Sequence, residues 1–298
     1  MERERWSELS AAISDVSRAI KSTRRHTHDI SLIIRVYLWA VLHDRPVVWA
    51  CHRRNWWPQV RPEELPSQPT MSRRTRSTQF DRFLDALSNR LRGSELAVLV
   101  KCIDGKALAV ARHSRDSDAT PGWGVGGMQR GYKLHAVWGS RSMPEVFEIR
   151  PMNEDERTVA KRLIPRLEGG GYLLGDNNFD TNDLFDFTAM HNHRLIAPRR
   201  RSYRYGKLAH IYQSPHRKRC IEMLEPGPGR PCLFGQVLAA QRRQIERDFA
   251  HLTSFGGGLT LPPFVRRLHR VRKWVHAKLL INAARIRANR RLRGLNGE

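Results

Sequence analysis

Three acidic side chains in this 298-residue chain have surroundings that suit chemistry better than packing. Asp104 follows the apolar run "LAVLVKCI", Asp176 follows "YLLG", and Glu246 lies in the amphipathic segment "RRQIERDF". A charge beside a core is costly, and two close carboxylates repel each other unless a cation lies between them. Mg²⁺ or Mn²⁺ offsets that cost, because these hard ions prefer carboxylate and phosphate oxygens. The pattern therefore predicts a divalent-metal site.

Basic side chains accompany these acids. Arg242 and Arg243 precede Glu246 by four and three residues and share its face of the predicted helix. Lys133 lies in "RGYKLHAV", where alternating residues predict a strand. Guanidinium groups bind phosphate oxygens in pairs of parallel hydrogen bonds. Carboxylates for a metal beside cations for a phosphate backbone predict phosphodiester cleavage.

Each acid also has an ordinary structural explanation. Asp104 before Gly105 could begin a turn, and Asp176 could begin an Asx turn. Glu246 could simply pair with Arg242 or Arg243. Three acids in the order strand end, strand end and helix favour a shared site. Asp180, the nearest competitor of Asp176, is explained as the cap of the helix that follows it.

The overall charge indicates a polyanionic partner. Lys and Arg total 53 against 29 Asp and Glu, a formal net charge of +24. Such a charge repels itself unless a polyanion is bound, and nucleic acid is the commonest one. A membrane partner is disfavoured because the arginines are spread through every region, and because the longest apolar stretch is too short to span a bilayer and contains Arg35. We expect a soluble, cytoplasmic protein.

Residues 1–93 form the first of two predicted regions and are helical, with apolar residues recurring every three or four positions. A short helix, a Pro-rich turn and a second helix opened by Thr70 or Ser72 indicate a helix-turn-helix module that contacts DNA. The alternative is a solvated basic face. The arginines concerned are Arg73, Arg74 and Arg76.

Residues 94–298 form the second region and read as α/β. Three strand-like runs end near residues 104, 113 and 139, and helices and strands then alternate. The first of these helices has Asn153 as a possible cap and Glu156 as its capping-box partner. The expected fold is a mixed sheet flanked by helices.

The remainder of this region is strongly basic. Residues 199–240 read as a small Pro- and Gly-rich insertion, mostly loop, whose first arginines are candidates for DNA contact. A basic helix ends the chain, and its apolar face, which repeats every four residues, is expected to pack on the sheet. The candidate arginines of the insertion are Arg199, Arg200 and Arg201.

Four segments, in this order, resemble the DDE transposases of bacterial insertion sequences: "CIDGKAL", "RGYKLHAV", "YLLGDNNFD" and "QRRQIERDF". The upstream "LPSQPTMSRR" resembles their N-terminal region, so the likeness covers nearly the whole chain. It implies a ribonuclease-H-like catalytic domain at 94–298, behind a DNA-binding or dimerisation region at 1–93. It also implies metal-dependent cleavage and strand transfer of double-stranded DNA, with binding to terminal inverted repeats and target DNA near the bacterial nucleoid. Asp104, Asp176 and Glu246 would be the catalytic residues and would hold two Mg²⁺ or Mn²⁺ ions, in a homodimer if two ends are cut together.

The chain departs from one signature of this family, Tyr-x2-Arg-x3-Glu-x6-Lys. Arg242 and Glu246 match it, but Ala239 occupies the Tyr position and Thr253 the Lys position. Two other functions stay open: a non-catalytic DNA-binding remnant or repressor, and a nuclease that cuts without joining. The presence of all three acids disfavours the first.

Overall fold

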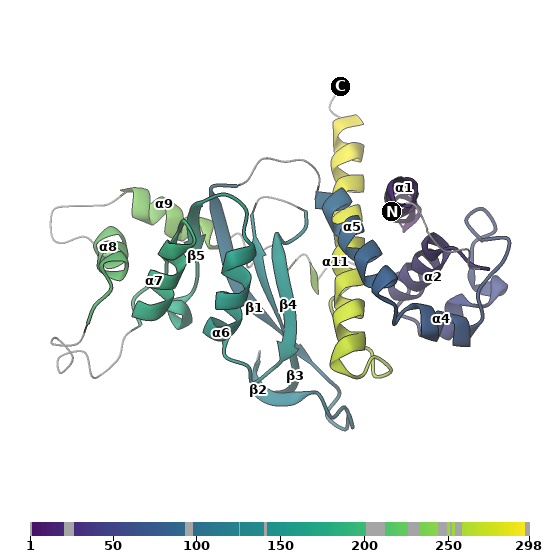
Figure 1. Ribbon diagram of the computed structural model, residues 1–298, viewed down its shortest axis with the longest axis horizontal. Helices are drawn as coiled ribbons and strands as arrows, with labels where there is room; N and C mark the ends of the chain where they lie inside the picture. The colour runs from purple at the N-terminus through teal and green to yellow at the C-terminus, as the bar shows by residue number, and fades with distance from the viewer. Residues whose placement is uncertain are drawn as a thin grey trace. The chain divides into compact units, whose positions relative to one another are not determined.

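The computed structural model describes residues 2–20, 27–92, 98–124, 126–139, 142–200, 212–225, 233–243, 249–250, 252–253 and 258–295 (Figure 1). The chain divides into two compact units. The helical unit comprises residues 1–94 and 251–298, and the sheet unit comprises residues 95–250.

The helical unit is built around α2, which is apolar on nearly every side and is buried along most of its length. Asp29 caps its first turn by accepting a hydrogen bond from the Ser31 N–H at 3.0 Å. The neighbouring helices α1, α3, α4, α5 and α11 all contact it. The elements are α1 (Glu2–Ala19), α2 (Ile30–Leu42), α3 (Val47–Ala50), η1 (Arg53–Asn55), α4 (Gln68–Arg74), α5 (Thr78–Arg92) and α11 (Leu268–Leu295). They confirm the prediction of an N-terminal helical region.

The basic helix predicted from Thr70 or Ser72 is two helices in the structure. Ser67 caps α4, accepting from the Thr70 N–H, and Ser77 accepts from the Phe80 N–H at 3.2 Å where α5 begins. Serine side chains compete with the helical backbone for these amide groups, so they start helices well and continue them poorly. The sequence pattern predicts the helical content here but misses the break.

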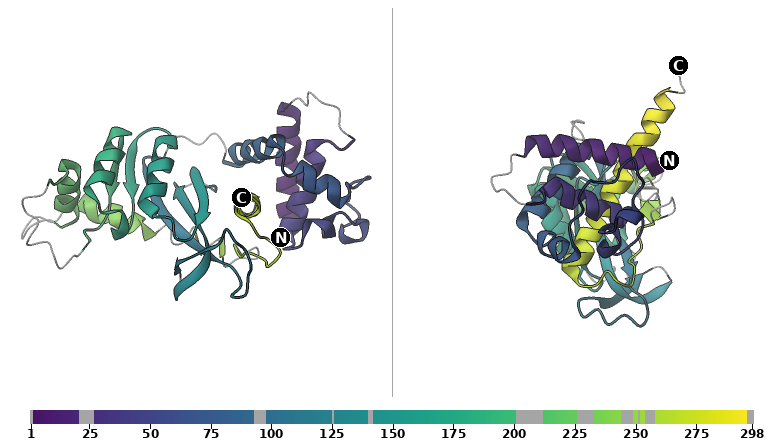
Figure 2. Two further views of the ribbon diagram at one scale, coloured as in Figure 1. Left: turned by 60° about the horizontal axis from the view of Figure 1, so that its bottom comes forward. Right: turned by 90° about the vertical axis from the view of Figure 1, so that its right-hand side faces the viewer.

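The long C-terminal helix α11 has a different partner from the one that its sequence suggests. Its apolar face was expected against the sheet, but Val271, Val275, Leu279 and Ala283 are buried inside the helical unit, where α11 packs on α1, α2 and α5. α11 crosses α1 in Figure 2. Periodicity shows which face of a helix is buried, but not against what. Of the helices that the structure describes, none has the length and hydrophobicity that crossing a bilayer requires.

The sheet unit alternates strands and helices after an initial antiparallel group. Its strands are β1 (Val100–Ala109), β2 (Thr120–Gly124), β3 (Gly127–Trp138), β4 (Val146–Pro151), β5 (Gly171–Leu174) and β6 (His193–Ile196). Its helices are α6 (Glu156–Leu163), η2 (Ile164–Arg166), η3 (Asn177–Phe179), α7 (Asn182–Met190), α8 (Pro215–Leu224) and α9 (Leu233–Gln241).

The sheet is mixed. β1 lies in its middle, antiparallel to β3 and parallel to β5, which in turn pairs in parallel with β6. β4 pairs with β3, and β2 forms a hairpin with the start of β3. α6 packs on β3 and β4, and α7 packs on β6. This arrangement confirms the predicted ribonuclease-H-like fold class.

Two features of the sheet unit differ from the sequence prediction. The first two strand-like runs, expected to be separate, form one continuous strand over residues 100–109, which pairs with β3 from Cys102 to Ala109; the turn considered as an alternative role for Asp104 is therefore absent. The stretch 199–240, predicted as mostly loop, contains α8 and α9 in its described part. Ser214 caps α8 by accepting from the His216 and Arg217 N–H groups. Isolated Pro and Gly residues obscured the short helical segments between them.

Candidate active site

Asp104 and Asp176 reach the same level of the sheet through the pairing of β1 with β5. The paired residues run from Val100 opposite Tyr172 to Cys102 opposite Leu174, where β5 ends. Continuing this register by two residues places Asp104 opposite Asp176. β1 itself continues, so Asp104 lies within a strand but beside the end of its parallel neighbour. Strand ends of this kind are where open α/β sheets bind ligands.

The local sequence around Asp176 explains how its carboxylate is held. Asp176 caps the short η3 turn, accepting hydrogen bonds from the Asn178 backbone N–H at 2.8 Å and from the Asn178 side chain at 3.2 Å. Phe179 is buried and anchors the turn. A side chain at Gly175 would place its Cβ 2.8 Å from the Phe179 ring, so only glycine fits before this aspartate. Asp176 therefore begins an Asx turn, and the same turn fixes the carboxylate that is the candidate metal ligand.

The carboxylate of Asp104 lies in an unfavourable electrostatic environment. Burial is the main cause that raises the pKa of Asp104 to about 6. The negative charges of Asp176 and Glu156 act in the same direction, while the Gly105 N–H and the Arg242 guanidinium act against them. A divalent cation between two such carboxylates offsets both the burial and the repulsion. The donor set of Asp104 and Asp176 therefore fits Mg²⁺ or Mn²⁺.

Glu156 is a neighbour of this site that sequence reasoning assigned to helix capping. Asp155 caps α6 instead, accepting from the N–H groups of the two residues that follow Glu156, and Asn153 hydrogen-bonds with Thr120. Glu156 is thereby free to pair with Lys133 at 2.7 Å. The only signal in the sequence was that Asp155 stands directly before the helix and can compete for the capping role.

Lys133, predicted to position phosphate, lies over β1 next to Asp104. It stands opposite Ala107 in the β1–β3 pairing, and its side chain extends toward Gly105. A Cβ on Gly105 would come within 2.8 Å of Lys133 Cδ and 2.9 Å of Glu156 Oε1. The Lys133–Glu156 ion pair therefore occupies the space that a side chain beside Asp104 would fill.

The residues on either side of the segment that contains Glu246 contact β1 and β3. Before it, the Gln241 carbonyl lies 3.9 Å from Cys102 Sγ. After it, the Phe249 ring packs edge-on against Trp138 with centroids 6.1 Å apart, and Trp138 pairs with Cys102. Glu246 itself lies outside the described residues.

Arg242, Arg243 and the other arginines predicted to contact DNA fall into different environments. The positive charge of Arg242 lowers the pKa of Asp104, so Arg242 lies close to that carboxylate. Arg243 is exposed. Arg73, Arg76, Arg199 and Arg200 are exposed as well. Arg201 lies outside the described residues.

Arg74 differs from its neighbours because it is buried. Its guanidinium donates to the Gln79 side chain at 3.4 Å, and burial lowers its pKa. A buried side chain in this position supports the junction of α4 and α5.

Asp180 also has a role other than the predicted one. It does not cap α7; it accepts hydrogen bonds from the Arg217 guanidinium on α8 at 2.5 and 2.8 Å and from the Arg200 N–H at 2.8 Å. Both side chains of the pair are almost fully buried. The pair ties the turn after Asp176 to α8.

Within the described residues, no group of three or more His, Cys, Asp and Glu side chains is arranged to hold a metal ion. The described donors are thus the two aspartates.

A comparison with protein families matches residues 99–282 to the model described as "Transposase DDE domain". No curated protein and no solved structure matches the chain.

Proposed function

The chain belongs to the transposase DDE domain family, and we propose that it is an active transposase that cleaves DNA at the ends of a mobile element and joins those ends to target DNA. The observation that carries this proposal is the register of β1 and β5, which brings Asp104 level with Asp176 at a strand end. The raised pKa of Asp104 supports it, because the site stabilises positive charge brought to it.

We propose that Asp104 and Asp176 hold divalent metal together with Glu246. Asp104 would contact both of two Mg²⁺ or Mn²⁺ ions, and Asp176 and Glu246 would each hold one. When bound, such ions generate a nucleophile from water or from a DNA 3′-hydroxyl and stabilise the leaving oxygen. The chain's own contribution is to fix the two described carboxylates, one by the sheet and the other by the η3 turn.

The DNA backbone would be positioned by cations around the carboxylates. The Arg242 guanidinium lies close enough to Asp104 to lower the pKa of its carboxyl group, and Arg243, the next residue, is exposed. Lys133 is held near the site by Glu156 and could exchange that carboxylate for a phosphate oxygen. Contacts of this kind fix the register of DNA without reading its bases.

Recognition of the terminal inverted repeats would fall to the exposed arginines of the helical unit, Arg73 and Arg76, and to Arg199, Arg200 and Arg201 at the start of the 199–240 stretch. A homodimer on DNA would allow both ends to be cut in one assembly.

The test is cleavage of terminal-repeat DNA by the Asp176→Asn chain. The amide keeps an oxygen for the Asn178 N–H but loses the charge that a cation requires. We expect cleavage to disappear while DNA binding is kept or tightened. The matched control is Asp183→Asn, which removes an exposed carboxylate of α7 that pairs with Lys161 on α6, and it should leave cleavage unchanged.

Each other outcome has a definite meaning. Undiminished cleavage by Asp176→Asn would refute the site. A wild-type chain that binds the repeats but does not cut them with Mg²⁺ or Mn²⁺ would be a non-catalytic binder. A chain that cuts, but does not join pre-cleaved ends to target DNA, would be a nuclease.

A further inference from the structure

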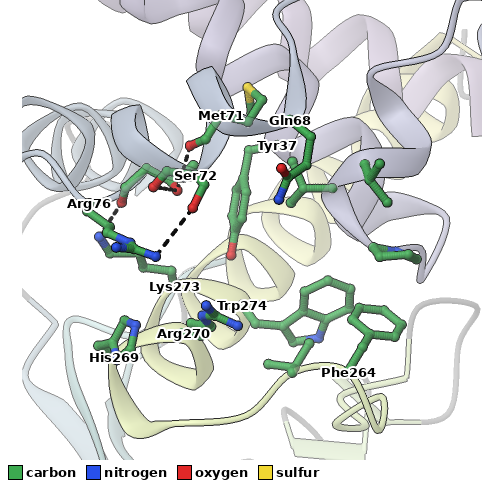
Figure 3. Close-up of a pocket in the computed structure, with 15 residues that line it drawn as sticks. Tyr37, Gln68, Met71, Ser72, Arg76, Phe264, His269, Arg270, Lys273 and Trp274 are labelled. Atoms are coloured by element: carbon green, nitrogen blue, oxygen red, sulfur yellow. Dashed lines mark hydrogen bonds between the residues drawn. The ribbon is translucent and has the colours of Figure 1, made fainter.

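The helical unit contains a pocket of about 260 Å³ that the proposed reaction does not use. Its walls come from α2, α3, α4, α11 and the segment before α11 (Figure 3). Pockets that take whole drug-sized ligands begin at roughly 300 Å³. This one therefore suits a single ring system.

The apolar part of the pocket is aromatic. Tyr37, Phe264 and Trp274 line it, and the rings of Phe264 and Trp274 meet edge-on with centroids 5.6 Å apart. Phe264 and Val48 remain 40% and 43% exposed at the pocket, so apolar surface is available to a ligand. Such surfaces favour a flat ring, which gains from stacking and from leaving water.

The Tyr37 hydroxyl is available to a ligand in the pocket. Tyr37 is only 7% exposed, and within the described part of the chain its hydroxyl makes no hydrogen bond. Figure 3 shows this hydroxyl directed toward the side of the pocket where Arg270 and Trp274 lie. A hydroxyl beside apolar walls gains from a hydrogen-bond partner when a ligand displaces water from it. A ligand with a polar edge would satisfy this one.

Cations line the pocket on the α4 and α11 sides. Arg76 and Arg270 are exposed, and no carboxylate of the described residues pairs with either. Among the described residues, the Arg76 guanidinium makes one long hydrogen bond, to Ser72 Oγ at 3.3 Å. Lys273 differs, because it is already paired with Asp81 at 3.1 Å. The two arginines are therefore available to an anion next to the aromatic walls.

We propose that this pocket, the Tyr37–Trp274 pocket, binds one unpaired base of DNA, with Arg76 and Arg270 on the phosphate beside it. A nucleotide combines the three features required: a flat ring, polar ring edges and an adjacent anion. A base within a duplex cannot enter, because its faces are covered and its edge is paired. This site is separate from the carboxylates and rests only on the part of the proposed function that makes DNA the ligand.

The experiment uses the full-length chain in EDTA, so that no DNA is cut. One duplex has a single unpaired 2-aminopurine, and a second duplex of the same sequence has that base paired with thymine. We expect the unpaired duplex to bind about 5- to 150-fold more tightly, the range that stacking of one base on an aromatic side chain provides. The fluorescence of 2-aminopurine should fall on binding.

Variants locate the effect. Val48→Trp fills the pocket from an exposed position, and Tyr37→Phe removes only the hydroxyl; both should lower the preference for the unpaired duplex without changing the affinity for the paired one. Arg270→Ala should lower this preference too. Arg290→Ala, which removes the same charge from an exposed position further along α11, should weaken both duplexes equally.

Equal affinity of the wild-type chain for the two duplexes would overturn the proposal, and so would a preference that survives Val48→Trp. If Val48→Trp changes self-association and no base preference exists, the pocket is a protein interface. A chain that cleaves paired DNA without this preference would refute the pocket alone. A preference without any cleavage in metal would refute the catalytic proposal alone.

Discussion

Two aspartates of the sheet unit, the buried Asp180 and the half-buried Asp104, illustrate two uses of the same side chain. Asp180 receives hydrogen bonds from the Arg217 guanidinium and the Arg200 N–H, and its charge is compensated within the chain. Asp104 accepts one hydrogen bond among the described residues, from the Gly105 N–H. Its carboxylate also lies near the negative charges of Asp176 and Glu156. The charge of the first carboxylate is neutralised by its hydrogen-bond partners in the folded chain. We propose that the second is compensated by a bound metal ion.

This difference offers a way to separate structural from functional acids. A compensated carboxylate should matter for stability, and an uncompensated one for activity, because the free energy that each can contribute depends on what it contacts. The following variants test the comparison in order of expected effect.

The largest effect should come from Asp104→Asn. With Mg²⁺, we expect DNA cleavage to fall on the order of 10³-fold, because bound metal contributes several kcal/mol to the transition state. In EDTA, thermal unfolding should occur at the same or a higher temperature, because a poorly compensated charge has been removed. A large loss of stability would place Asp104 in the same class as Asp180.

The opposite result is expected for Asp180→Ala. Arg217 would then be buried without its partner, which typically costs about 3–5 kcal/mol of unfolding free energy. Urea unfolding of the full chain measures this loss. The double variant Asp180→Ala, Arg217→Met should recover part of it, since no buried charge remains. A single variant as stable as the wild type would show that the pair contributes little.

A half-buried histidine extends the comparison to a group that is kept neutral. His276 on α11 contacts Ser88 Oγ at 2.6 Å, and burial lowers its pKa to about 4. The unfolded chain binds this proton near pH 6.5 and the folded chain only near pH 4, so stability is full above pH 6.5 and falls as the pH drops toward 4. We expect a loss of about 3 kcal/mol across this window. His276→Gln should flatten that part of the pH profile in urea titrations.

The smallest effect concerns single arginines at the α4–α5 junction. Arg73→Ala should weaken DNA binding modestly and reduce the slope of log affinity against log salt by about 1, as expected for one lost phosphate contact. Arg74→Ala should lower stability and leave the slope unchanged, because Arg74 is buried. Equal salt slopes for the two variants would remove the distinction between them.

Much of the site could be predicted because its signals are local. The apolar runs before Asp104 and Asp176 predict strands, and Asp176 was a candidate to begin an Asx turn; the structure contains both the strands and the turn. Glu156 could not be assigned in this way. Its position beside Asp104 depends on Asp155 capping α6 and on Lys133 lying across β1, and neither contact follows from spacing along the chain.

The amino-acid sequence by itself determined the mixed sheet, the helical N-terminal region, the strongly basic charge and the candidate acids, because these follow from short-range periodicity and composition. Tertiary structure decided that residues 100–109 form one strand, that β5 ends beside Asp104, and that α11 packs on α1, α2 and α5. The physical reason is that an apolar strand or helix face can pack against several other apolar faces with a similar gain in free energy. Their selection depends on the shape of the whole unit, which no short segment contains.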